Sequence, residues 1–229
     1  MPLFKHKKNP IWIVAAPKVM TSTLRSQPLV EQFNPSLRNF LTISRISATS
    51  WRGQTVVMLY RDPISRIKSF YRDAFHTHPA NMMSRRDSLQ SNYWRRSQRI
   101  FFPDLGLDNE STDQEISETL QSTSFETMLA FFKRLWWQDP HIAPQSSQVL
   151  FRYRAYSVAL KPERYLNIEN QELKDFFDKH HMQISMRKNQ TEKKSSLLIN
   201  GQDRNFLKAI YSEDYERFSV ARSLNSKSR

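Results

Sequence analysis

A short apolar run that leads directly into a basic, polar loop constrains the fold more than any other feature. Residues 11–16 (IWIVAA) are apolar throughout and lie between Pro10 and Pro17, a pattern typical of a central strand covered on both faces. Lys18 follows at the carboxyl end, and the hydroxyl residues 21–23 then begin a helix. Because the first N–H groups of a helix lack internal partners, this order predicts an anion site.

A second interpretation of this stretch stays open, since a strand followed by lysine and hydroxyl residues is common. An ordinary capped helix start explains residues 11–25 as well as a phosphate site does. The loop also lacks the GxxxxGK[ST] spacing of a Walker A loop and contains no glycine. If a nucleotide binds here, the sequence favours one held without Mg²⁺ over ATP hydrolysis.

A second apolar run repeats the same order. Residues 55–60 (TVVMLY) lead into RDPISRIKSFYRDAF, where Asp62 suits an N-cap and Pro63 suits the first helical position. Strands that alternate with helices predict a parallel sheet with right-handed crossovers, whose ligands bind beyond the carboxyl ends of the strands. Lys18 and Arg61 both follow such ends. Together they predict a cleft for a ligand with more than one anionic group.

Shorter patterns predict the other elements. Residues 40–46 (FLTISRI) alternate apolar and polar side chains and predict a short strand, and residues 164–168 (RYLNI) predict another. Thr123 and Glu126 predict a capping box for an apolar helix. We therefore expect one α/β domain over residues 1–229, in which helices flank a central parallel β-sheet. Flexible ends are expected at 1–10 and 219–229.

Composition limits the possible partners. Lys and Arg total 35 against 22 Asp and Glu, so the formal net charge is +13 and the pI is about 10.1. This charge predicts a polyanion, a nucleotide or an anionic membrane surface as partner, although a solvated basic face explains it too. The absence of cysteine excludes disulfides and thiolate metal sites. No apolar run reaches the roughly 18 residues of a membrane span, so we expect a soluble, cytoplasmic protein.

A basic segment at 76–99 has no apolar period. We interpret it as a flap that binds an anionic or aromatic acceptor, or as an exposed mobile loop or basic helix. Its arginines lie around Tyr93 and Trp94 and are Arg85, Arg86, Arg95, Arg96 and Arg99.

Several stretches resemble the PAPS-dependent sulfotransferases, nearest to their carbohydrate-type, Golgi-like branch. PKVMTSTL resembles the 5′-phosphosulfate loop of that family, and LYRDPISRIKSFYRDAF resembles its 3′-phosphate segment. Three further stretches agree: TSFETMLAFF before DPHIAPQ, RYLNIENQEL, and IYSEDYERF. Together they extend over residues 11–218. The resemblance implies a P-loop-like sulfotransferase fold that transfers a sulfuryl group from PAPS and releases PAP, without a metal.

The resemblance also implies roles for single residues. Lys18 would contact the bridging and sulfuryl oxygens, and Arg61 and Ser69 would hold the 3′-phosphate. Ser69 is otherwise a plain serine on a helix surface. Lys194 lies where the family returns to the nucleotide. The residues that would wrap the 5′-phosphate are Val19, Met20, Thr21, Ser22 and Thr23.

A general base near the acceptor hydroxyl would complete this chemistry. His141 in the HIAPQ cluster is the first candidate, followed by His76 and His78, and each is otherwise a structural or surface histidine. The implied acceptor is a hydroxyl of a carbohydrate, such as an anionic saccharide, or of a small natural product. No nucleic-acid partner is expected.

Two departures from the family bear on this expectation. Met20 stands where the family usually has Gly or Ala, so its side chain must point away from the phosphosulfate. Animal members carry disulfides and a membrane anchor, so bacterial relatives are the better fit. Two other functions stay open: a basic protein that binds polyanions or nucleic acid without catalysis, and a P-loop-like nucleotide kinase.

Overall fold

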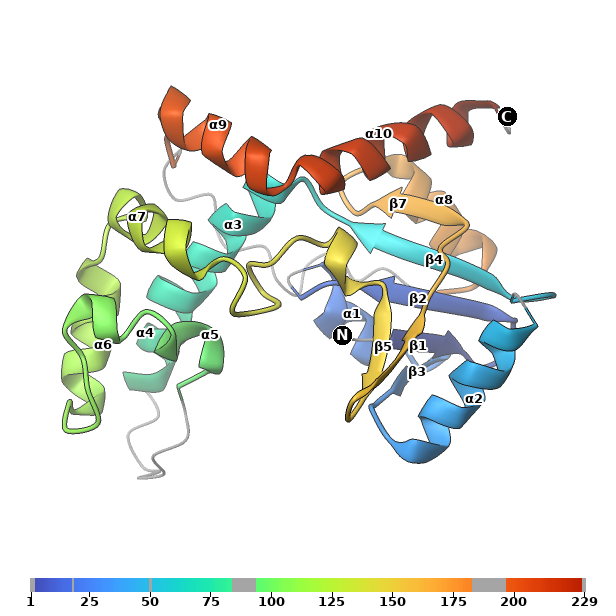
Figure 1. Cartoon of the computed structure of the whole chain (residues 1–229), viewed down its shortest axis with the longest axis horizontal. Coiled ribbons are helices and arrows are strands. Elements are labelled where there is room, and N and C mark those ends of the chain that lie inside the picture. The colour runs from blue at the N-terminus through green and yellow to red at the C-terminus, as the bar shows by residue number, and fades with distance from the viewer. Residues whose placement is uncertain (1–2, 18, 50, 84–93, 183–196, 228–229) are drawn as a thin grey trace. The chain divides into compact units, whose positions relative to one another are not determined.

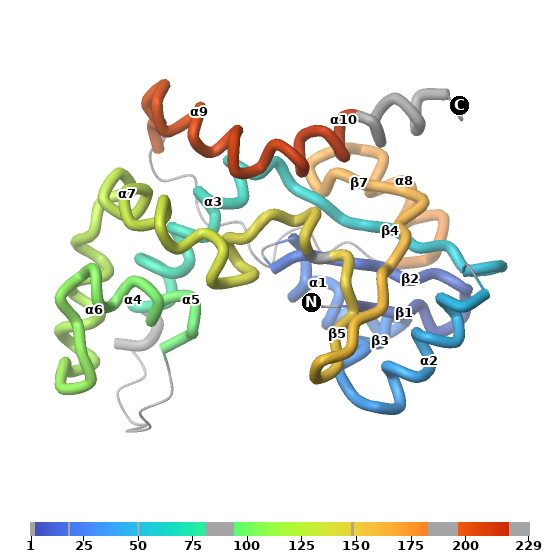
Figure 2. Tube along the Cα trace, in the orientation of Figure 1, coloured from blue at the N-terminus to red at the C-terminus, as the bar shows by residue number. Residues whose placement is uncertain are grey.

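The chain folds into two compact units. The computed structural model describes residues 3–17, 19–49, 51–83, 94–182 and 197–227. Unit 1 comprises Met1–Pro63, Pro144–Asn189 and Lys208–Arg229, and unit 2 comprises Ile64–Ala143 and Gln190–Leu207. Along the chain trace, unit 1 thus draws on the blue start, the yellow-to-orange middle and the red end (Figure 2). The expectation of a single domain over 1–229 stays a prediction.

Unit 1 is built on a mixed sheet of five described strands (Figure 1). In chain order these are β1 (Leu3–His6), β2 (Ile11–Ala15), β3 (Val30–Phe33), β4 (Thr55–Tyr60) and β7 (Arg164–Asn167). Their order in space is β3-β1-β2-β4-β7. β2, β4 and β7 are parallel, whereas β1 is antiparallel to both β2 and β3. The strands predicted at 11–16, 55–60 and 164–168 are confirmed.

The sheet is mixed rather than wholly parallel because β1 precedes β2 by only a short turn. A connection of that length joins antiparallel strands, since a parallel pair needs a crossover of a dozen or more residues. The expected flexible start at 1–10 is therefore wrong for Leu3–His6, which pairs with strands on both sides.

Both faces of the sheet are buried, as predicted for β2. Alternate residues of the central strands enter two separate clusters: Ile13 and Leu59 lie on one face, and Trp12 and Met58 lie on the other. All four side chains are fully buried. Because strands that are covered on both faces need apolar residues at every position, the uninterrupted runs IWIVA and TVVMLY follow directly from this architecture.

Different elements cover the two faces. The face with Ile13 packs against α1 (Thr21–Arg25) and α8 (Gln171–Lys179). The opposite face packs against α2 (Leu37–Ala48), the hairpin β5 (Leu150–Tyr153) and β6 (Tyr156–Ala159), and α10 (Ser212–Lys227). α10 continues through Lys227, beyond the start of the flexible end expected at 219.

The strand expected at 40–46 is wrong, because these residues belong to α2. The Ser36 side chain caps this helix by accepting a hydrogen bond from the N–H of Asn39 at 3.2 Å. Ile43 is buried, and Phe40 and Ile46 pack partly buried against the same cluster. These three residues recur every third position, which is the spacing of a helix face, whereas the alternation that favours a strand involves only Leu41 and Ile43.

Unit 2 is helical and has an aromatic core. Phe75 makes ring contacts with Phe70, Tyr71 and Phe101. Its elements are α3 (Pro63–Tyr71), which begins on the last residue of unit 1, the π-helix η1 (Arg72–Thr77), α4 (His78–Met83), α5 (Arg96–Arg99), η2 (Pro103–Leu105), α6 (Asp113–Ser122), α7 (Phe125–Leu135) and most of α9 (Gly201–Ile210).

The capping box predicted for α7 from Thr123 and Glu126 is wrong, and the helix has a single side-chain cap one residue later. Ser124, and not Thr123, accepts the capping bond, from the N–H of Thr127 at 3.0 Å. Thr123 instead ends α6, where its hydroxyl donates to the carbonyl of Thr119. Thr123 therefore ends α6 and Ser124 begins α7, and the sequence pattern alone does not show which of the two hydroxyl residues is the N-cap.

In the residues that the structure describes, no helix is both long enough and apolar enough to cross a membrane. Within the same ranges, no group of three or more His, Asp or Glu side chains is placed to hold a metal ion.

Candidate anion-binding site

The loop after β2 and the first residue after β4 leave the sheet at the same edge. β2 and β4 are parallel neighbours, with Ala15 opposite Leu59. Arg61 follows directly after the end of β4 and is thus at a strand end, as predicted. Lys18, the other predicted cation, lies outside the described residues. This edge of unit 1 is where a ligand of an open α/β sheet is expected.

Met20 adopts a backbone conformation that usually belongs to glycine. Its φ of 56° and ψ of 15° lie in the left-handed region, directly before α1. Its side chain is partly buried against the core cluster that contains Val19 and Leu24. A side chain in this region costs about 1–2 kcal/mol, which core packing can offset. The loop therefore accommodates Met20 by turning its side chain toward the core.

The start of α1 offers backbone donors. Its first intrahelical bond runs from the N–H of Leu24 to the carbonyl of Met20 at 2.9 Å, so the N–H groups of residues 21–23 precede the helical ladder. The Ser22 side chain is exposed, whereas Thr23 is buried. Because α1 has only five residues, its dipole is small, and the loop depends on a second cationic group to bind an anion strongly.

Arg61 is partly buried and already has one acidic partner. Its Nε lies 2.9 Å from Oε1 of Glu169, which follows β7, and the two side chains are 26% and 43% exposed. The hydrogen bond to Glu169 is made through Nε of the guanidinium. The ion pair therefore restrains the direction of the Arg61 side chain.

A buried glutamine holds the backbone of Arg61 from both sides. The N–H of Arg61 donates to Oε1 of Gln145 at 3.0 Å, and Nε2 of Gln145 donates to the carbonyl of Arg61 at 2.8 Å. Gln145 is itself held by Asp214 of α10, whose carboxylate accepts the N–H of Gln145 at 2.9 Å and that of Ser146 at 2.6 Å. Gln145 and Asp214 are fully buried. We call this arrangement the Gln145–Asp214 clamp.

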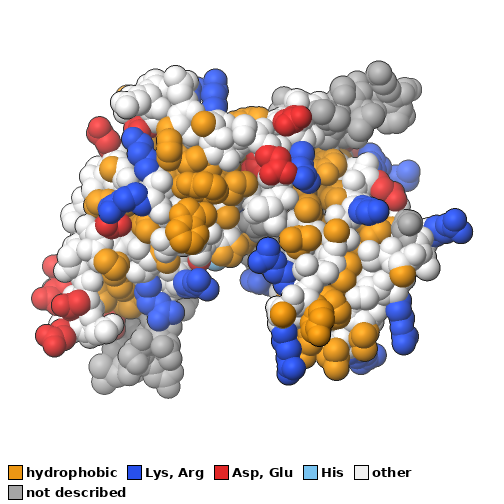
Figure 3. All heavy atoms as spheres, in the orientation of Figure 1, with side chains coloured by type: hydrophobic (Ala, Val, Ile, Leu, Met, Phe, Trp, Pro, Cys, Tyr) orange, Lys and Arg blue, Asp and Glu red, His pale blue; other side chains and the backbone are white. Residues whose placement is uncertain are grey.

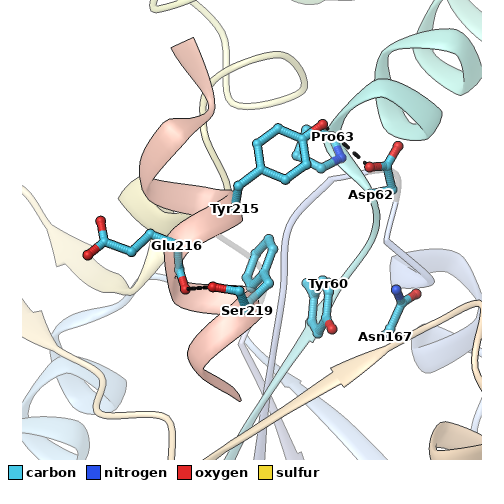
Figure 4. A pocket seen from close by; sticks show the side chains of 8 residues that line it. Tyr60, Asp62, Pro63, Asn167, Tyr215, Glu216 and Ser219 are labelled. Carbon is cyan, nitrogen blue, oxygen red and sulfur yellow. Dashed lines mark hydrogen bonds between the residues drawn. The ribbon is translucent and has the colours of Figure 1, made fainter. Parts of the chain in front are cut away.

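A pocket of about 520 Å³ opens beside the ends of β4 and β7, below α10 (Figure 4). Tyr60 and Asn167 line it from the strands, and the Tyr215 hydroxyl points toward Asp62 at 3.4 Å. Glu216 adds a second carboxyl group. Among the described residues that line the pocket, none is Lys or Arg. This lining is poorly matched to phosphate.

In unit 2, His141 forms a pair with a buried aspartate. Its Nδ1 lies 2.6 Å from Oδ1 of Asp139, which also accepts the His141 backbone N–H at 2.8 Å. Asp139 is 3% exposed in its side chain, and His141 is 32% exposed. Burial alone would raise the pKa of Asp139, but the hydrogen bonds from His141 outweigh burial and the pKa lies below its ordinary value. An ionised Asp139 requires a proton on Nδ1 of His141, which leaves Nε2 as the basic nitrogen.

The remaining predicted residues lie in unit 2 or outside the described residues, so their place in the site stays a prediction. Ser69 lies half-buried on α3 in unit 2, and its pairing with Arg61 stays a prediction. His76 lies in η1, where burial lowers its pKa, and His78 Nδ1 lies 3.2 Å from Gln98 Nε2. Lys194 and the arginine-rich stretch 84–93 lie outside the described residues.

Sequence reasoning missed three residues that shape this edge: Gln145, Glu169 and Asp214. Each lies in a stretch that carries the family resemblance, but its contact is distant in sequence. The separations are 84 residues for Arg61 and Gln145, 108 for Arg61 and Glu169, and 69 for Gln145 and Asp214. The polar residues in HIAPQ, IENQ and SEDYERF were the only local signal.

Comparison of the chain with protein-family models, with curated proteins and with solved structures finds no match.

Proposed function

We propose that this protein is a PAPS-dependent sulfotransferase, which moves a sulfuryl group to a hydroxyl of a carbohydrate or a small natural product. One observation carries the proposal: the β2–α1 loop and Arg61 leave adjacent parallel strands at one edge of the sheet. A ligand with two anionic groups suits such a pair, and PAPS has a 5′-phosphosulfate and a 3′-phosphate. We also propose that unit 1 has a P-loop-like sulfotransferase fold, which the same strand–loop–helix order supports.

In this proposal the chain binds the donor through two groups of residues. Lys18 and residues 19–23 bind the phosphosulfate, through the lysine charge and the N–H groups at the start of α1. Arg61 binds the 3′-phosphate with its Nη groups, while Glu169 and the Gln145–Asp214 clamp keep its side chain and backbone in place. Ser69 and Lys194 are proposed as further donor contacts.

In the proposed reaction the protein positions the donor and the acceptor and stabilises the charge that develops. The acceptor oxygen bonds to sulfur as the bond between sulfur and the 5′-phosphate oxygen breaks, and the acceptor proton leaves to a base. Lys18 offsets the charge that develops on the leaving phosphate. His141 receives the proton at Nε2, because Asp139 holds the other ring nitrogen. A base of this kind typically contributes about 10² to 10⁴ in rate.

Thermal unfolding with adenosine 3′,5′-bisphosphate tests the donor site. Saturation at about 100 times the dissociation constant stabilises a protein by about 2.7 kcal/mol, which for a chain of this size raises the melting temperature by about 5–10 °C. We expect this shift in the wild type and its loss in Arg61→Ala. Lys18→Ala should keep much of the shift but lose sulfuryl transfer.

The matched control is Arg204→Ala, which removes an exposed arginine from α9. Its shift should equal that of the wild type. Stabilisation by ATP–Mg²⁺ alone would support the nucleotide kinase and reject our proposal. Absence of any shift with the bisphosphate would reject it as well.

A polyanion-binding protein is the second candidate, favoured by the net charge of +13. It predicts binding that is spread over many basic residues, so that Arg61→Ala and Arg204→Ala would weaken binding of a heparin fragment to a similar extent. For a sulfotransferase we expect Arg61→Ala to lose the thermal shift with adenosine 3′,5′-bisphosphate and Arg204→Ala to keep it.

A further inference from the structure

One surface of unit 1 combines exposed apolar side chains with arginines. It is formed by α2 and the β5–β6 hairpin, which pack against each other. The Phe40 ring of α2 lies 6.0 Å from the ring of Tyr153 and 6.0 Å from that of Tyr156, measured between centroids. We call this the α2–hairpin surface and define it by residues 37–49 and 150–159.

The apolar side chains of this surface are unusually exposed. Leu37 is 55% exposed, Leu41 is 48% and Tyr156 is 65%. Leu37 and Leu41 are one turn apart and so lie on the same side of α2, next to Phe40. Figure 3 shows apolar side chains gathered over the hairpin and the neighbouring end of α2, with Lys and Arg side chains around them. Grouped exposed apolar residues of this kind mark interaction surfaces.

The charge on this surface has one sign. Exposed arginines come from both parts: Arg38 and Arg45 from α2, and Arg152 and Arg154 from the hairpin. Arg38 and Arg45 are two turns apart and so flank the leucines along one side of the helix. Residues 34–60 and 144–162 contain no Asp or Glu, although the chain has 22 acidic residues. The arginines therefore have no acidic neighbour within these segments.

The tip of the hairpin keeps an arginine in a strained position. Arg154 has a φ of 51°, in the left-handed region that glycine or asparagine adopts more easily at a hairpin turn. Its guanidinium lies 5.4 Å from the centre of the Tyr153 ring. The backbone thus tolerates strain at a position where the chain places an exposed positive charge.

We propose that the α2–hairpin surface binds the anionic face of a lipid membrane. The leucines and Tyr156 would enter the boundary between headgroups and acyl chains, and the arginines beside them would meet the lipid phosphates. A surface without acidic groups suits a membrane, which presents negative charge over a wide area. A folded protein partner would need an acidic patch of matching shape. This inference does not depend on the proposed enzymatic activity.

Cosedimentation of the full chain with phosphatidylcholine vesicles, with and without phosphatidylserine, tests the proposal. We expect binding only to vesicles that contain phosphatidylserine. Removing both hairpin charges in R152S/R154S should weaken binding by about fivefold for each arginine. The pair L37S/L41S should weaken it by roughly tenfold, because less apolar area enters the membrane. Arg154→Lys should bind as the wild type does, since a membrane requires the charge and not a bidentate guanidinium.

Arg204→Ser on α9 is the control and should retain most of the binding. Equal losses for Arg204→Ser and the hairpin variant would overturn the proposal, as would the absence of binding that requires phosphatidylserine. Loss with the arginine variant but not with L37S/L41S would also overturn it, because purely electrostatic binding points to a nucleic acid or an acidic protein. The thermal midpoint of each variant monitors folding, and Tyr156→Ser provides a second apolar test if the leucine pair unfolds.

Discussion

At the scale of single residues, Asp139 and His141 form the pair whose chemistry is best defined. The carboxylate of Asp139 is buried and accepts two hydrogen bonds from one histidine, so it fixes both the orientation and the tautomer of the ring. A charge held in this way contributes to stability as well as to any proton transfer.

Asp139→Asn should therefore show a stability deficit that depends on pH. The pKa of Asp139 is lowered in the folded protein, so its contribution is present above the unfolded-state pKa and is lost as the pH falls through the folded-state pKa. We expect the variant to be less stable than the wild type by about 1 kcal/mol or more at pH 7, because hydrogen bonds to ionised groups are stronger than neutral ones. Urea unfolding measured from pH 7 downward should show the gap closing at acidic pH.

Asp178→Asn, which changes an exposed carboxylate on α8, is the control and should show little deficit at any pH. A deficit for Asp139→Asn that stays constant down to acidic pH would contradict the assignment of an ionised Asp139.

Single residues also show what the sequence can predict. Arg61 was placed correctly because an apolar run ends directly before it, which is a local signal. The positive φ of Met20 was not predicted, since only a glycine or asparagine would have indicated it. Its packing against the core depends on Val19 and Leu24, and thus on the fold.

At the scale of elements, the Gln145–Asp214 clamp joins the end of β4, the segment before η3 (Ser146–Gln148) and α10. Gln145→Ala would leave the N–H and carbonyl of Arg61 without these partners. We expect a loss of about 1–3 kcal/mol in the free energy of unfolding, together with weaker binding of adenosine 3′,5′-bisphosphate. Urea unfolding and isothermal titration calorimetry measure the two effects separately.

Two variants sharpen this prediction. Gln145→Glu keeps an acceptor for the Arg61 N–H but replaces the donor to its carbonyl with a buried carboxylate, so it should be at least as unstable as Gln145→Ala. Ser147→Ala changes an exposed neighbour and should behave as the wild type does. If Gln145→Ala loses stability but binds the bisphosphate normally, the clamp does not position Arg61 for a ligand.

The elements that the sequence predicted correctly share a strong local signal. β2 and β4 are continuous apolar runs, and α3 begins at the Asp62–Pro63 pair. The wrong predictions concern short or ambiguous patterns. β1 has only four residues among lysines and is stabilised by pairing on both sides. Residues 40–46 satisfy a helical and an alternating pattern at once, and the cap at Ser36 was the better signal.

At the scale of the whole molecule, the net charge of +13 makes salt dependence informative. A protein that binds a polyanion through six to ten phosphate contacts loses about 10³ to 10⁵ in affinity between 50 and 200 mM salt. A small ligand held by a few partly buried groups is screened far less. We expect the affinity for adenosine 3′,5′-bisphosphate to fall by less than about tenfold over this range, measured by isothermal titration calorimetry.

A heparin fragment titrated under the same conditions gives the comparison. A salt dependence for the bisphosphate as steep as that for heparin would indicate binding by diffuse charge and would argue against a defined two-phosphate site.

Neither the division into two units nor the contacts that complete unit 1 could be inferred from local patterns. Unit 1 is assembled from three separate stretches of chain, with most of unit 2 between the first two and the rest between the second and third. The tetrad of Arg61, Gln145, Glu169 and Asp214 draws on all three stretches. Periodicity identifies elements one at a time and gives no information on which distant elements meet.

The discontinuity of unit 1 has a consequence for how the chain acquires its structure during synthesis. β1, β2 and β3 lie within the first 33 residues, so their antiparallel pairing closes only short loops. β7 joins β4 only after residue 164 has emerged, and α10 covers the sheet later still. Until then one edge of β4 has no strand beside it and is open to incorrect pairing. A fragment that stops before β7 therefore cannot complete this sheet.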